Sequence, residues 1–299
     1  MPKICYRPKK FNDDRKDKIA KANVIIDEYR AQGFELTLRQ LYYQFVSRDF
    51  IANNQREYKN LGDIINDARL AGLVDWKAIV DRTRNLQALA NWETPSDIIK
   101  ACASQYRVDK WAEQQYRVEC WIEKDALVGV IEGVCNELDI DYFSCRGYTS
   151  QSEMWAAAMR LKRYQDEAQV PLILHLGDHD PSGKDMTRDI TDRLTEFSGG
   201  DIEVKRLALN MPQIEQYTPP PNPAKITDSR AEKYIEEFGA ESWELDALEP
   251  AVIAQLIRDA VMEVRDQDQW DEAVTKEEEQ KAQLTKVSAK WNTIIEELE

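Results

Sequence analysis

The chain has 299 residues, of which 42% are hydrophobic and 32% are charged, and its formal net charge is −15. This length allows two domains with a substantial core, and the composition is typical of a globular protein. No apolar run approaches the ~18 residues of a membrane span, and the N-terminus lacks the apolar core of a signal peptide. Five cysteines without a CxxC pair and only two histidines argue against a disulfide framework, a zinc site and a Ser-His triad. We therefore expect a cytoplasmic protein with reduced thiols and no membrane partner.

The negative charge is unevenly distributed along the chain. Residues 1–100 carry 18 Lys and Arg against 14 Asp and Glu, whereas residues 201–299 carry 11 against 23. The basic excess lies in the first twenty residues, which include Arg7, Lys9 and Lys10. Because the local field attracts a polyanion whatever the total charge, this end is compatible with binding to DNA phosphates. A solvated charged tail would have the same composition, so charge alone leaves both interpretations open.

Residues 1–116 have the pattern of a mostly helical domain. Apolar residues recur at helical spacing up to Gly33, Thr37 precedes the segment LRQLYYQFVSR as a helix cap, and a third helix is expected to end at Gly72. Three short helices with tight turns indicate a winged-helix or helix-turn-helix module, although small helical bundles share this pattern. Arg69 in the third helix, like Arg82 and Arg84 beyond it, faces either phosphate or solvent.

Residues 117–216 alternate between strand and helix patterns. Four predicted strands, RVECWIE, IDYFSC, PLILHLG and IEVKRLAL, are separated by three predicted helices. This order predicts a parallel α/β sheet with both faces covered, in which ligands gather at the carboxyl ends of the strands. The segment YTPPPNPAK then interrupts the chain, and residues 217–299 form an acidic helical region. The expected architecture is thus a helical winged-helix-like domain, a parallel-sheet domain and a C-terminal helical extension.

Three carboxylates follow two of the predicted strands. Glu123 ends the first strand, and Asp178 and Asp180 end the third, in the segment LILHLGDHDPSG. Like charges this close repel one another unless a cation lies between them, and Mg²⁺ prefers oxygen ligands of this kind. An alternative is structural, with Asp178 as a helix N-cap and Asp180 in the first helical turn. The presence of Glu123 at the neighbouring strand end favours the magnesium site.

Three segments resemble, in order and spacing, the Toprim domain of topoisomerase VI A subunits and the meiotic double-strand-break proteins. They are WIEKDALV, RGYTSQSE and HLGDHDPSG, and the resemblance covers about residues 117–208. It implies that Glu123, Asp178 and Asp180 bind Mg²⁺ and that Lys124 lies beside the scissile phosphate. The chain departs from the family at GYTS, which lacks the acidic residue of the usual GYPD turn. Its length is similar to that of the short stand-alone versions called mini-A proteins.

The same family carries its nucleophilic tyrosine in the winged-helix domain, in an R-D-[IV]-[FY]-Y segment that LRQLYYQF resembles from Arg39 to Tyr43. At 100° per residue, Tyr42 falls on the apolar stripe of this helix, whereas Tyr43 lies off the stripe and one turn from Arg39. We therefore expect Tyr42 to pack in the core and Tyr43 to be an exposed phenol beside a guanidinium. A nearby cation favours the phenolate that a nucleophile needs.

The resemblance implies a Mg²⁺-dependent, nucleoid-associated enzyme that transfers a phosphodiester of double-stranded DNA to Tyr43, in the manner of a type IIB topoisomerase. In that family the tyrosine and the Toprim acids of one site come from different subunits, which implies a homodimer. A separate ATPase subunit of the B type is a further partner that the family implies. Two alternatives stay open: a Toprim nuclease that hydrolyses DNA with metal-activated water, and a non-catalytic DNA-binding module.

Overall fold

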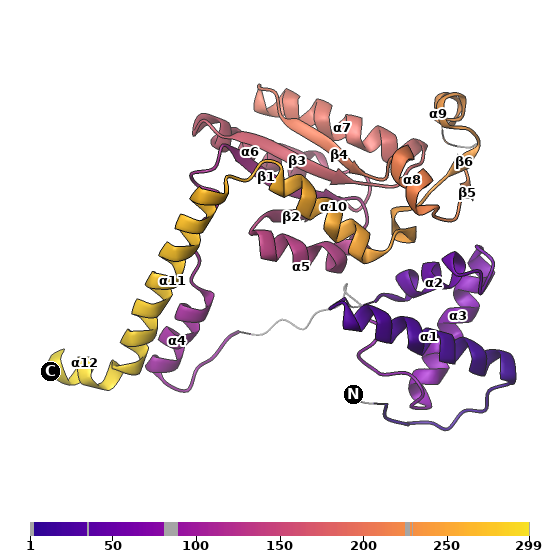
Figure 1. Ribbon diagram of the computed structural model, residues 1–299, viewed down its shortest axis with the longest axis horizontal. Helices are drawn as coiled ribbons and strands as arrows, with labels where there is room; N and C mark the ends of the chain where they lie inside the picture. Colours follow the sequence, from indigo (N-terminus) through magenta and orange to yellow (C-terminus); the bar gives the residue numbers. More distant parts are fainter. Residues whose placement is uncertain (1–2, 35, 81–88, 225–227, 229, 299) are drawn as a thin grey trace.

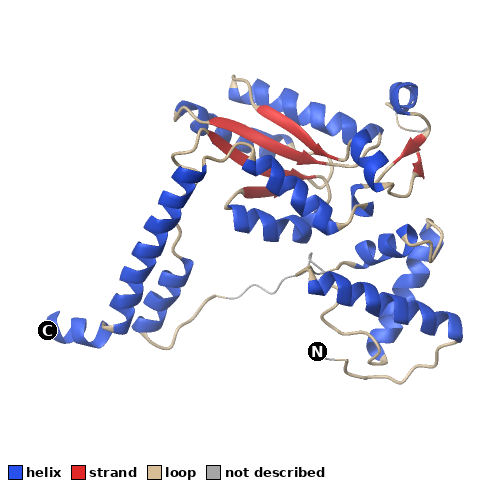
Figure 2. Cartoon of the chain, viewed as in Figure 1, coloured by secondary structure: helices blue, strands red, loops and turns tan. Residues whose placement is uncertain are grey.

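The computed structural model describes residues 3–34, 36–80, 89–224, 228 and 230–298 (Figure 1). Helices predominate, and one parallel sheet lies among them (Figure 2). The three N-terminal helices are α1 (Asp13–Ala31), α2 (Leu38–Ser47) and α3 (Gln55–Leu70). They pack around a hydrophobic cluster of their own that includes Ile25, Phe45 and Ile64.

The start of α2 follows the prediction. Thr37 caps this helix, since its hydroxyl accepts the amide of Gln40 while the Gln40 side chain accepts the amide of Thr37. Outside the three helices, the described residues up to Val80 contain only isolated bridges, Leu36 with Ile79 and Cys5 with Ala71. The helical character of this part is confirmed, and the assignment as a winged helix stays a prediction.

The predicted parallel sheet is confirmed. Its strands lie in the order β2-β1-β3-β4 and all neighbours are parallel. They are β1 (Tyr116–Ile122), β2 (Asp141–Ser144), β3 (Val170–Leu176) and β4 (Glu203–Ala208). Ile122 pairs with Leu176, so β1 and β3 end side by side. The residues after these two strands therefore meet at one edge of the sheet.

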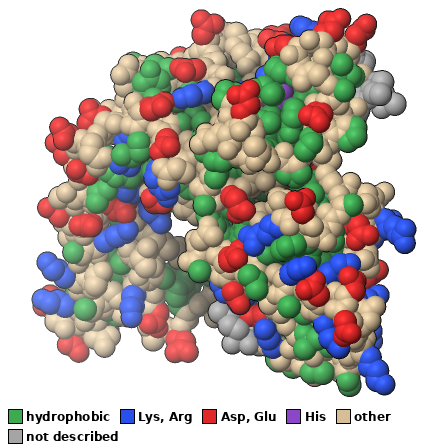
Figure 3. All heavy atoms as spheres, turned by 45° about the vertical axis from the view of Figure 1, so that its right-hand side comes forward, with side chains coloured by type: hydrophobic (Ala, Val, Ile, Leu, Met, Phe, Trp, Pro, Cys, Tyr) green, Lys and Arg blue, Asp and Glu red, His purple; other side chains and the backbone are tan. Residues whose placement is uncertain are grey.

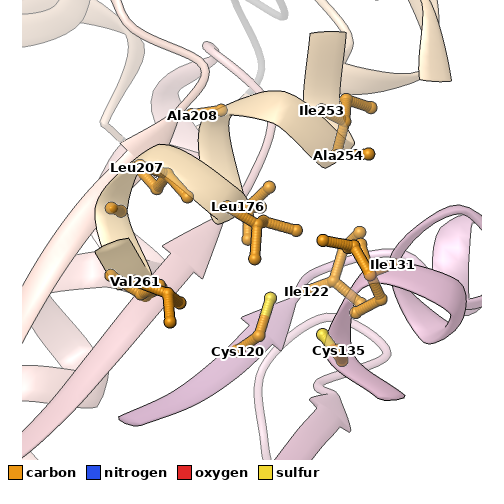
Figure 4. Packing of buried hydrophobic residues seen from close by; sticks show 14 of the residues in the cluster. Cys120, Ile122, Ile131, Cys135, Leu176, Leu207, Ala208, Ile253, Ala254 and Val261 are labelled. Carbon is orange, nitrogen blue, oxygen red and sulfur yellow. The ribbon is translucent and has the colours of Figure 1, made fainter. Parts of the chain in front are cut away.

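Helices cover both faces of the sheet. They are α5 (Val128–Leu138) and α10 (Pro250–Met262) on one face, with α6 (Gln151–Asp166) and α7 (Pro181–Ser198) on the other. On the first face, Ile122 of β1 packs with Ile131 of α5 and Ile253 of α10 (Figure 4). Because α10 follows the proline-rich segment, the core extends across the predicted boundary at 216. The division into domains 1–116, 117–216 and 217–299 stays a prediction.

A helical pair extends away from the sheet (Figure 1). It consists of α4 (Pro95–Gln105), which precedes the sheet, and α11 (Gln267–Ala289), and α12 (Trp291–Leu298) follows α11. Polar contacts join the pair, among them Ser96 with the carbonyl of Ser288. The elements between β4 and α10 are shorter: α8 (Met211–Tyr217), β5 (Asn222–Pro223), α9 (Ala231–Phe238) and β6 (Glu241–Ser242). Two single-turn helices, η1 (Asp125–Leu127) and η2 (Leu245–Ala247), lie next to the site described below.

Candidate functional site

The predicted carboxylates meet where β1 and β3 end. The amide of Asp178 donates to Oε2 of Glu123 over 2.9 Å, and Asp180 lies two residues further on. The backbone is tightly folded here: a Cβ on Gly177 would lie 2.9 Å from Glu123 Oε2, and one on Gly183 would lie 2.2 Å from the carbonyl oxygen of Asp178. Gly177 therefore permits the approach of the two strand ends, and Gly183 permits the close packing of the loop against the start of α7.

Burial and mutual repulsion act on this pair of carboxyl groups. Burial, followed by the charge of Asp178, raises the pKa of Glu123 to about 7. Burial also raises the pKa of Asp178 to about 6, with a contribution from the charge of Asp246, although Lys124 opposes the shift. A hard divalent cation would relieve this repulsion, so the oxygen donor set fits Mg²⁺. Within the described residues, however, no three His, Cys, Asp or Glu side chains already converge as a metal site.

The two aspartates have different local roles. Asp180 is the N-cap of α7, and its Oδ1 accepts the amide of Gly183 over 2.6 Å. Asp178 instead accepts the amide of Leu245 over 2.8 Å at Oδ1. The structural alternative is thus wrong in its assignments, because the N-cap of α7 is Asp180 and not Asp178, and Asp180 precedes the first helical turn. The capping role of Asp180 leaves its second oxygen for other contacts.

Lys124 lies at the centre of an acidic group. Its Nζ lies 2.8 Å from Asp178 Oδ2, 2.8 Å from Glu244 Oε2 and 3.4 Å from Asp246 Oδ1. Burial lowers the pKa of this ammonium, but the three carboxylates outweigh that effect and raise it. Lys124 is therefore a permanent cation beside the predicted metal ligands.

Tyr43 differs from the prediction in its exposure. Only 5% of this residue is accessible, so the expectation of an exposed phenol is wrong. Arg39 lies next to it as expected, with the guanidinium carbon 5.7 Å from the ring centroid. Burial raises the pKa of Tyr43, and the charge of Glu244 raises it further, while Arg39 lowers it too little to compensate. In this arrangement Tyr43 is a neutral phenol.

Tyr42 is buried as predicted, and its hydroxyl has structural partners. It donates to Oδ1 of Asn53 over 3.0 Å and to the carbonyl of Asn54 over 3.2 Å. Both tyrosines also line a cavity of about 390 Å³ together with Arg39. The hydroxyl of Tyr43 is thus the one that lies in the charged network, while that of Tyr42 is bound to backbone and amide groups.

Sequence reasoning missed Glu244 and Asp246. Arg39 donates from Nη2 to Glu244 Oε2 over 2.5 Å and from Nε to Asp246 Oδ2 over 2.7 Å. The side chain of Asp246 is fully buried. The signal was present in WELDAL, where two acids alternate with apolar residues, but their partners lie 120 to 207 residues away.

Arg206 is a second missed residue. Its guanidinium donates to the carbonyls of Gly177, Asp178 and Gly183, and also to the hydroxyl of Thr187. Burial lowers its pKa to about 10, although the predicted metal ligands favour its charge. Arg206 therefore holds the loop that carries Asp178 and Asp180. The signal in the sequence is a charged residue in the strand pattern IEVKRLAL.

The predicted DNA-binding residues lie in different environments. Arg7 and Lys10 are exposed, whereas Lys9 pairs with Asp67 over 2.9 Å. Arg69 donates to the carbonyl of Trp76 over 2.6 Å and lies over its ring, at the edge of a cavity of about 610 Å³. Acidic and basic side chains are mixed over the visible surface (Figure 3). Arg82 and Arg84 lie outside the described residues.

Of the helices that the structure describes, none has the length and apolarity to cross a bilayer. No protein-family model, curated protein or solved structure matches this chain at a significant level. Its function is therefore argued from the residues of this site.

Proposed function

We propose that this chain is a Mg²⁺-dependent enzyme that cleaves DNA by transferring a phosphodiester to Tyr43, in the manner of topoisomerase VI A subunits. One observation carries the proposal: Arg39 of α2 and Lys124 at the end of β1 both bind Glu244 beside Asp178, and the charge of this carboxylate also acts on Tyr43 of α2. A nucleophile, two cations and buried carboxylates are the groups that a tyrosyl transfer on phosphate needs.

Glu123, Asp178 and Asp180 would hold the magnesium ion. When bound, Mg²⁺ supplies positive charge to the phosphate oxygens and stabilises the charge that develops there. Arg39 and Lys124 orient the phosphate and add further positive charge. The Tyr43 oxygen forms the new bond to phosphorus as the bond to the departing sugar oxygen breaks. The phenolic proton passes to water, and the departing oxygen takes a proton from water.

A second candidate has a specific observation in its favour. Tyr43 is buried, and burial together with Glu244 raises its pKa, which makes the phenol a poor nucleophile in this arrangement. A Toprim nuclease in which metal-activated water attacks the phosphate needs only the carboxylates and Lys124. In that enzyme Tyr43 would be a packing residue.

Replacing the two tyrosines separately tests the proposal. Tyr43→Phe removes the attacking oxygen but keeps the ring, so cleavage of supercoiled DNA should fall to background. Wild-type reactions stopped with denaturant should contain protein-linked DNA that proteinase releases and detergent does not. Tyr42→Phe is the matched control, because it removes the neighbouring hydroxyl and should retain cleavage. Wild-type cleavage by Tyr43→Phe without a covalent intermediate would establish the hydrolytic nuclease instead.

The proposed homodimer is tested by mixing inactive chains. The family resemblance implies that tyrosine and acids of one site come from different subunits, whereas here Arg39, which lies beside Tyr43, and Lys124 both bind Glu244 of the same chain. If sites are shared between subunits, a mixture of Tyr43→Phe and Asp178→Asn proteins should regain cleavage. If each chain builds its own site, the mixture should stay inactive.

A further inference from the structure

The carboxylate of Glu244 lies among the three residues that would surround the phosphate in the proposed reaction, Arg39, Lys124 and Tyr43. Oε2 of Glu244 lies 2.5 Å from Arg39 Nη2 and 2.8 Å from Lys124 Nζ. Tyr43 lies beside Arg39, whose guanidinium carbon is 5.7 Å from the ring centroid, and the charge of Glu244 raises the pKa of the Tyr43 hydroxyl. Glu244 therefore binds two cations that come from separate parts of the chain and lies near a phenol.

These contacts are the ones that a scissile phosphodiester requires. A phosphodiester and a carboxylate each carry one negative charge, and each presents two oxygens to guanidinium and ammonium donors. A phosphate under attack by Tyr43 must also lie next to the phenolic oxygen. We propose that Glu244 occupies the position of the scissile phosphate, and that a phosphodiester of DNA binds by displacing this side chain from Arg39 and Lys124. The inference depends on the proposed function for the identity of the ligand.

The surroundings of Glu244 allow its side chain to leave without unfolding the segment that carries it. The backbone on its C-terminal side is fixed, because the amide of Leu245 donates to Asp178 and the carboxylate of Glu249 accepts a hydrogen bond from Tyr29. The side chains of Glu244 and Arg39 are partly exposed, and Arg39 borders the 390 Å³ cavity that Tyr43 also lines. Displacement thus needs a rotation of one side chain toward solvent.

Both cations keep a partner when Glu244 leaves. Arg39 retains Asp246 at 2.7 Å, and Lys124 retains Asp178 at 2.8 Å. An isolated buried charge is therefore not created, and the variant Glu244→Gln should fold. The same reasoning gives its effect on DNA: removing this internal anion leaves Arg39 and Lys124 able to bind phosphate without competition from Glu244.

The test measures the affinity of the full chain for a fluorescent DNA duplex in EDTA, where no cleavage occurs. Glu244→Gln should bind the duplex about tenfold more tightly than wild type, as expected for loss of one charged competitor. Glu249→Gln is the matched control, since it removes the same charge from the same segment and from a tyrosine contact. It should change the affinity by less than about twofold. Adding Arg39→Gln to Glu244→Gln should cancel most of the gain.

Each other outcome has a distinct meaning. Equal affinities of Glu244→Gln and Glu249→Gln would overturn the inference. Unchanged affinity with loss of cleavage in Mg²⁺ would also overturn it and would make Glu244 the proton acceptor of Tyr43. Tighter binding by Glu244→Gln in a protein that never cleaves DNA would support the phosphate position and contradict the proposed function. If Glu244→Gln fails to fold, Glu244→Asp, whose shorter side chain cannot reach both cations, should show part of the gain, and wild-type affinity would refute the inference.

Discussion

The ammonium nitrogen of Lys124 lies 2.8 Å from Oδ2 of Asp178, so a cation of the protein itself balances part of the charge at the predicted metal site. Lys124 offsets only part of the cost of ionising Asp178, because the pKa of Asp178 is still raised to about 6, chiefly by burial. Replacement of Asp178 should therefore affect both activity and the pH dependence of stability.

We expect Asp178→Asn to lose Mg²⁺-dependent cleavage while it folds normally. The folded-state pKa of Asp178 lies above its ordinary value of 3.8, so ionisation costs stability as the pH rises from about 4 through 6. The asparagine variant escapes this cost, which amounts to at most about 3 kcal/mol. Chemical denaturation at pH 4 and pH 8 measures the free energy of unfolding. That of the variant should rise relative to wild type at pH 8. A variant that is destabilised equally at both pH values, with cleavage preserved, would remove Asp178 from the metal site.

Binding of Mg²⁺ should weaken as the pH falls. At pH 6 most of Glu123 is protonated, because burial and the charge of Asp178 raise its pKa to about 7, whereas at pH 8 both groups are ionised. Since Mg²⁺ must displace these protons, we expect its apparent affinity to be about tenfold lower at pH 6. Thermal shift measured against Mg²⁺ concentration at both pH values checks this. Asp178→Asn should show no shift at either, and a wild-type affinity that does not change with pH would contradict the prediction.

The sheet could be predicted because the sequence patterns of its strands and helices lie within short, contiguous segments. Strand β1 alternates apolar residues at Val118, Cys120 and Ile122, strand β3 is a nearly continuous apolar run, and the helices α5 and α7 follow them at short distances. Parallel order then places Glu123 and Asp178 at one edge. The N-cap at Thr37 is local in the same way and was also predicted.

The surroundings of Tyr43 could not be predicted, because they depend on contacts that are distant in sequence. A helical projection identifies the side of α2 that faces its own domain, but Glu244, whose charge raises the pKa of Tyr43, lies 201 positions further along the chain. A helix can be covered on two sides, and this segment covers the second one. Arg206 was missed for a related reason: its role depends on carbonyl groups of a loop that only the folded sheet brings to it.

DNA binding should depend on salt through the exposed basic residues of the N-terminal segment. Arg7 and Lys10 are exposed and form no ion pair with any residue that the structure describes. Arg7→Gln combined with Lys10→Gln should reduce the slope of log affinity against log salt by about 2, or roughly 0.9 for each phosphate contact. Substitution is preferable to deletion, because the amides of Tyr6 and Arg7 donate to the carbonyl of Leu70.

The matched control for this experiment is Lys16→Gln combined with Lys21→Gln. These lysines pair with Asp13 and Asp17 on α1 over 2.9 Å and 2.7 Å. The control removes the same total charge, so it separates a local contact from a general electrostatic effect. Equal slopes for the two double variants would place the phosphate contacts elsewhere on the chain.

Arg206→Gln should destabilise the protein and disrupt the predicted metal site while the chain still folds. The guanidinium donates to three carbonyls of the loop from Gly177 to Gly183, and a shorter amide cannot reach all of them. Buried carbonyls without partners cost about 1–3 kcal/mol each, so we expect the free energy of unfolding to fall by about 2–4 kcal/mol. Lys205→Gln, on the same strand, removes only an exposed pair with Glu263 and should cost less than about 1 kcal/mol.

The decisive measurement for Arg206 is the response of the folded variant to Mg²⁺. Because the loop carries Asp178 and Asp180, its displacement should abolish the thermal stabilisation by Mg²⁺ at temperatures where Arg206→Gln is still folded. The Lys205→Gln protein should keep the full stabilisation. If Arg206→Gln is destabilised but still gains as much stability from Mg²⁺ as wild type, then Arg206 supports the sheet alone, and the metal ligands are positioned without it.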